Sequence, residues 1–160
     1  MGKVEPWYLG ERAAQLAILM LTRIPDVSVD RDERGIGLDL LVRIGGPGSG
    51  GRIFGAEAKG IRKIADAVGR ENKVRAHYRD ELEQLAGDAP FPVALLIFDM
   101  SDDTGYFGWF MEPVVPRGEG APEVRPVHEL KVEELTNTKL REVIASVTEW
   151  YDARLACRVS

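Results

Sequence analysis

Hydrophobic residues recur along this chain with two different spacings, which separate helices from strands. A spacing of three and four residues predicts helices over residues 9–24, 72–86 and about 137–155. Alternating or continuous apolar runs predict five strands, over residues 27–30, 36–44, 52–59, 91–100 and 106–111. Pro25 stops the first helix, and Asn137 or Thr138 is the expected N-cap of the last one.

The order of these elements predicts the fold class. The first three strands have short connections and should form a meander, and the strand after the second helix can join the same sheet through a crossover. The glycine-rich residues 45–51 are expected to form a hairpin loop, and residues 112–126, which contain four prolines, a longer loop. The chain is therefore predicted to be α/β, with a mixed central sheet flanked by helices, an extra strand and a C-terminal helix.

Length and composition are typical of one soluble domain spanning residues 1–160. No apolar run approaches the roughly 20 residues that span a bilayer, and the first residues lack the layout of a signal peptide. A single cysteine, Cys157, excludes an internal disulfide and a cysteine-built zinc site. We therefore expect a cytoplasmic protein with no membrane partner.

The charge is unevenly distributed. The net charge is −5, which argues against a protein that coats nucleic acid non-specifically. Residues 59–79, however, carry seven basic and two acidic side chains, a surplus of +5 that leaves −10 for the rest of the chain. This segment could attract a polyanion, or it could be an ordinary solvated helix face. Charge alone favours the second interpretation.

The candidate chemistry lies in the second and third predicted strands. Asp39 is expected inside the first of these apolar runs, and Glu57 and Lys59 share one face of the next because strand side chains alternate. Buried acids need partners. Two carboxylates and an ammonium on adjacent strands suit Mg²⁺ or Mn²⁺, and they equally suit a buried Asp–Lys–Glu ion cluster without metal. The residues alone leave both interpretations open.

The motifs GIGLDLLV and FGAEAKG, in this order of elements, resemble the PD-(D/E)XK nuclease superfamily over about residues 9–110, which leaves 112–160 as a C-terminal extension. The resemblance implies a restriction-endonuclease-like αβββαβ core and a Mg²⁺- or Mn²⁺-dependent phosphodiesterase. Asp39 and Glu57 would be metal ligands and Lys59 the catalytic lysine. The stretch LGERAAQLAILML resembles the family's first helix, which makes Glu11 an auxiliary acid near the metal. Leu38 departs from the pattern, since the family's name-giving motif has proline there.

The resemblance also implies partners. DNA is the expected substrate, with RNA left open, and the small bacterial relatives suggest phage defence or mobile elements. One site nicks one strand, so double-strand cutting would need a homodimer. Two other classes remain open: a non-catalytic module that binds a partner protein or nucleic acid, and a nuclease subunit active only in a larger complex. The candidate phosphate contacts are Lys63, Lys73, Arg75 and Arg79.

Overall fold

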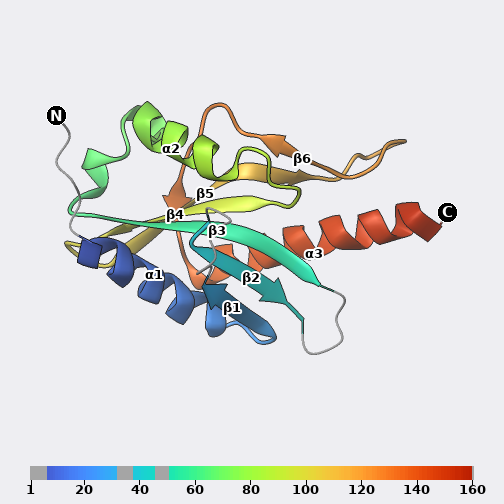
Figure 1. Cartoon of the computed structure of the whole chain (residues 1–160), viewed down its shortest axis with the longest axis horizontal. Helices are drawn as coiled ribbons and strands as arrows, with labels where there is room; N and C mark the ends of the chain where they lie inside the picture. The colour runs from blue at the N-terminus through green and yellow to red at the C-terminus, as the bar shows by residue number, and fades with distance from the viewer. Residues whose placement is uncertain (1–6, 32–37, 46–50, 160) are drawn as a thin grey trace.

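The structure is a computed structural model that describes residues 7–31, 38–45 and 51–159 (Figure 1). Its first half contains the elements α1 (Trp7–Thr22), β1 (Val27–Arg31), β2 (Leu40–Ile44), β3 (Arg52–Ile61) and α2 (Ala76–Ala86). Its second half contains β4 (Val93–Asp99), β5 (Thr104–Val114), β6 (Glu123–Pro126), β7 (Glu133–Glu134) and α3 (Asn137–Val159). Two short 3₁₀ helices, Ile64–Asp66 and Arg70–Asn72, lie between β3 and α2.

All the strands belong to one mixed, open sheet. Its order is β1-β2-β3-β4-β5-β6, and β7 also pairs with β5. The pair β3–β4 is parallel because α2 crosses between these strands, and every other pair is antiparallel. The predicted α/β class with a meander, a crossover and flanking helices is confirmed.

The helices form two layers on the sheet: α1 and α3 cover one face, and α2 covers the other (Figure 1). The alternation along β3 produces this arrangement. Phe54, Ala56 and Ala58 point into the core shared with α1 and α3. Glu57 and Lys59 therefore point to the opposite face, where Leu82 of α2 packs on β4. This second core contains fewer buried residues than the first, and the polar side chains of Glu57 and Lys59 lie on its face of β3.

Several predicted bounds were wrong, for local reasons. The helix predicted over 72–86 begins only at Ala76, because Lys73 and Val74 form β-bridges instead. The loop predicted over 112–126 contains the end of β5 and the edge strand β6, and β7 was not expected at all. Pairing with β5 satisfies these backbone groups despite the prolines, which edge strands tolerate. Residues 36–37 and 46–50, from the predicted strand and hairpin loop, lie outside the described residues.

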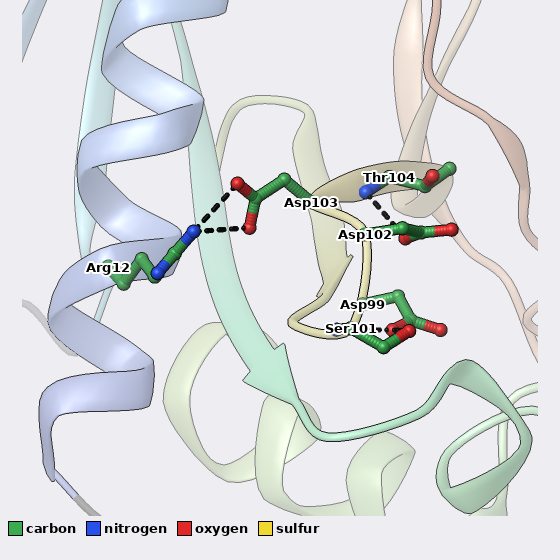
Figure 2. A network of polar contacts seen from close by, with 6 residues as sticks. All are labelled: Arg12, Asp99, Ser101, Asp102, Asp103 and Thr104. Carbon is green, nitrogen blue, oxygen red and sulfur yellow. Dashed lines mark hydrogen bonds and ion pairs between the residues drawn. The ribbon is translucent and has the colours of Figure 1, made fainter.

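An ion pair joins α1 to the turn between β4 and β5. Figure 2 shows Arg12 of α1 reaching Asp103 in the β4–β5 turn, with two bonds of 2.8 and 2.7 Å to the carboxylate. At the end of β4, Asp99 accepts hydrogen bonds from Ser101 in this turn and from the Ile64 N–H of the β3–α2 connection at 2.9 Å. These contacts fix the carboxyl end of β4 beside the start of the β3–α2 connection.

The backbone of α1 packs closely on β3 at Gly60. We expect Gly60→Ala to destabilise the protein by about 2–3 kcal/mol, because its Cβ would lie 2.2 Å from the Leu9 carbonyl oxygen. Gly10→Ala in α1 is the matched control: its Cβ would meet nothing within 4 Å, and alanine should stabilise the helix by about 0.5–1 kcal/mol. Urea unfolding of both variants measures the difference, and equal effects would contradict the close packing.

No helix in the described part of the chain has the length and apolar character needed to cross a membrane.

Candidate functional site

The structure brings Asp39 and Glu57 together where β2 begins. The ladder pairs Leu40 of β2 with Ala56 of β3, so Asp39, one residue earlier, lies beside Glu57. The Asp39 N–H donates to Glu57 Oε2 at 3.1 Å, and Asp39 Oδ2 accepts from the Ala58 N–H at 3.1 Å. Each carboxylate therefore has one oxygen held by a backbone N–H, and the two side chains also interact directly with each other.

The two acids differ in burial, which the sequence did not predict. Glu57 is only 5% exposed, whereas Asp39, expected inside a strand, is exposed because β2 starts one residue after it. Asp39 thus closes the end of the β2–β3 ladder and remains open to solvent. The pair consists of one buried and one accessible carboxylate.

Burial and the neighbouring Asp39 charge raise the pKa of Glu57 to about 8, although the Asp39 N–H and the Lys59 charge oppose this shift. Asp99, the other buried acid, behaves differently. Its burial also favours the neutral form, but bonds from Ser101 and Ile64 outweigh it and lower the pKa of Asp99. The chain therefore stabilises the charge of one buried carboxylate and leaves that of the other poorly compensated.

Lys59 lies on the same face of β3 as Glu57 but contacts a different acid. Its Nζ lies 2.8 Å from Glu81 Oε2 of α2. Burial alone would lower the pKa of Lys59, yet the bond and charge of Glu81, together with the charges of Glu57 and Asp39, raise it. Among the described residues, no ion pair joins a basic side chain to Asp39 or Glu57. In the predicted Asp–Lys–Glu cluster, Lys59 therefore forms no ion pair with Asp39 or Glu57 and pairs with Glu81 instead.

Glu81 was missed by the sequence analysis. A signal existed, since Glu81 lies three residues after Tyr78 and four before Leu85, on the helix side that carries the predicted apolar stripe. An acid at such a position faces the sheet it packs on. The spacing does not say which strand residue it meets.

Glu11 does not join the pair. Both of its carboxylate oxygens accept from Arg31 at 2.8 Å, and this hydrogen bond lowers the pKa of Glu11. Over residues 7–31, 38–45 and 51–159, no group of three or more His, Cys, Asp or Glu side chains gathers in a way that could hold a metal ion. The described arrangement therefore offers two carboxylates, with Glu11 held at β1.

The four candidate phosphate contacts fall into two groups. Lys73 lies between Glu71 and Glu129, at 3.6 and 3.5 Å, and Arg79 pairs with Glu83 at 2.9 Å. Arg75 donates to the Ala65 carbonyl at 3.0 Å and is otherwise exposed. Lys63 is exposed and forms no ion pair with the described residues. Lys63 and Arg75 thus remain accessible beyond the carboxyl end of β3, and Lys73 and Arg79 are engaged by acids.

The donor set fits a hard divalent cation. Mg²⁺ keeps several of its waters and is commonly held by one or two carboxylates together with substrate phosphate. Asp39, directly before β2, and Glu57 of β3 supply two adjacent carboxylates, and one oxygen of each is held by a backbone N–H. Their negative charge lacks a paired cation within the described residues, so a bound metal ion would relieve the cost of ionising Glu57.

No protein-family model matches the chain, and searches of curated proteins and of solved structures also found no match.

Proposed function

We propose that this protein is a divalent-metal-dependent phosphodiesterase that cleaves DNA and has a restriction-endonuclease-like core. One observation carries the proposal. Asp39 and Glu57 lie side by side where β2 begins, and Lys59 lies on the same face of β3 but forms its ion pair with Glu81 instead of with these two acids. The order of elements supports it, since a helix, an antiparallel meander, a second helix and a parallel strand follow one another as in that core.

Each residue then has a chemical role. Asp39 and Glu57 would hold the ion, and a bound Mg²⁺ or Mn²⁺ supplies positive charge at the scissile phosphate and eases deprotonation of the attacking water. Lys59 donates hydrogen bonds to that water or to the oxygen on which charge develops. Glu57 and Lys59 project from the paired strand β3, and the Asp39 side chain is held by the Ala58 N–H, so their geometry is largely set before substrate arrives. Lys63, at the carboxyl end of β3, contacts a neighbouring phosphate.

The first test needs no knowledge of the substrate. We expect Mn²⁺ at 100 times its Kd to stabilise the protein by about 2.7 kcal/mol, which raises Tm by about 5–10 °C in a chain of this size. Asp39→Asn should abolish this shift, because the amide keeps an acceptor for the Ala58 N–H but loses the charge. A thermal-unfolding titration of the two proteins measures the effect.

Asp80→Asn provides the matched control, since Asp80 is an exposed acid of α2 and its loss should leave the Mn²⁺ shift intact. An equal shift in Asp39→Asn would remove Asp39 from the metal site. If the wild type shows no shift, the titration is repeated with a DNA duplex, because substrate phosphate completes many magnesium sites. A second negative result would favour a non-catalytic module that binds a partner protein or nucleic acid.

A further inference from the structure

The ion pair between Lys59 and Glu81 joins β3 to α2 next to the carboxylate pair. Its atoms lie 2.8 Å apart, and the Lys59 side chain is 28% exposed and that of Glu81 49% exposed. Isolated exposed pairs contribute little to stability. The Lys59–Glu81 pair differs from an isolated pair because the Lys59 ammonium is also attracted by the charges of Glu57 and Asp39.

Lys59 therefore has two competing acidic partners. Glu57 lies two residues earlier on the same strand face beside Asp39, and no basic side chain among the described residues forms an ion pair with either acid. Without Glu81, the strongest remaining attraction on the flexible lysine would come from the Asp39–Glu57 pair. An ammonium that moved there would close the ion cluster and compete with a divalent cation for the same oxygens.

We propose that Glu81 is a positioning residue. By pairing with the Lys59 ammonium it keeps this group close to Asp39 and Glu57 but prevents the ammonium from forming an ion pair with these two carboxylates. The carboxylates thereby stay available for a cation, and the ammonium stays directed at the substrate. This inference rests on the proposed metal site. It assigns no ligand role to Glu81, whose carboxylate is engaged by Lys59.

Metal affinity in a double-mutant cycle tests the inference without any substrate. Mn²⁺ binding is measured by isothermal titration calorimetry for the wild type, Glu81→Gln, Lys59→Met and the double variant. We expect Glu81→Gln to weaken Mn²⁺ binding about fivefold to tenfold when Lys59 is present, because the released ammonium competes. In the Lys59→Met background the same change should have an effect below about twofold.

The double-mutant cycle distinguishes two ways in which Glu81 could change Mn²⁺ affinity: by positioning Lys59, or by its own negative charge. If Glu81 acted only through its long-range negative charge, Glu81→Gln would weaken binding by the same factor in both backgrounds, and that result would overturn the proposal. Asp80→Asn, which removes the adjacent exposed acid of α2, should change affinity less than twofold in either background. Absence of Mn²⁺ binding by the wild type, with and without DNA, would overturn the metal site and this inference with it. Wild-type binding with an additive cycle would overturn the inference alone.

Discussion

Glu57→Gln is expected to stabilise the metal-free protein strongly at pH 9 and hardly at pH 5. The folded protein keeps a proton on Glu57 up to about pH 8, whereas the unfolded chain releases it near the ordinary pKa of 4.5. The folded state therefore binds more protons between these values, and the free energy of unfolding falls as pH rises through this window. The loss approaches about 5 kcal/mol as an upper limit, and a neutral glutamine avoids it.

Urea unfolding at pH 5, 7 and 9 in the presence of a chelator measures this difference. The glutamine amide oxygen keeps an acceptor for the Asp39 N–H, so the variant should retain the local geometry. Glu149→Gln, at an exposed acid of α3, should change stability by less than about 0.5 kcal/mol at each pH. Parallel pH curves for the wild type and Glu57→Gln would show that Glu57 is ionised in the folded protein at neutral pH.

The elements of this fold could be predicted because local pattern and tertiary structure agree over most of the chain. The helical spacing of α1 and α3 and the alternation along β3 each reflect which face is buried. The errors occur where backbone pairing overrides local preference. Val74 bridges to Val68, and β6 forms on the edge of β5 although Pro126 ends it. Such pairing depends on residues far apart in sequence, so no local pattern reveals it.

The candidate site was predictable to the same extent. Antiparallel pairing of two strands that follow each other in sequence brings Asp39 and Glu57 close, because the register of the first pairs determines the next. The partners of Glu11 and Lys59 were not predictable. Arg31 and Glu81 lie 20 and 22 residues away from them in sequence, and these contacts depend on how α1 and α2 cross the sheet.

The chain contains three E-x-K tripeptides, Glu57–Lys59, Glu71–Lys73 and Glu129–Lys131, and they illustrate the same limit. Glu71 and Glu129 are exposed, and both lie near Lys73, so these copies form ordinary surface pairs. Glu57 differs because its strand is central in the sheet and buried between two helical layers. The tripeptide gains its candidate chemistry from this burial, which raises the energy of an uncompensated charge.

Lys59→Met should reduce DNA cleavage by about 10²–10³-fold, the usual effect of removing one preorganised donor from a site where charge develops. The fold should persist, because methionine retains an apolar side chain for the half-buried position and the remaining Glu81 is 49% exposed. Nicking of supercoiled plasmid in Mn²⁺ measures cleavage, and the Mn²⁺ shift in Tm shows that the metal site is intact.

Lys139→Met is the matched control for this experiment. Lys139 of α3 is 24% exposed and paired with Glu133, much as Lys59 is 28% exposed and paired with Glu81. Its loss should leave cleavage per folded molecule unchanged, because α3 covers the sheet face opposite Glu57. Full cleavage by Lys59→Met would exclude Lys59 from the reaction. Retained Mn²⁺ binding without cleavage would instead show that metal and lysine act at separable steps, as expected if Glu81 keeps the ammonium off the carboxylates.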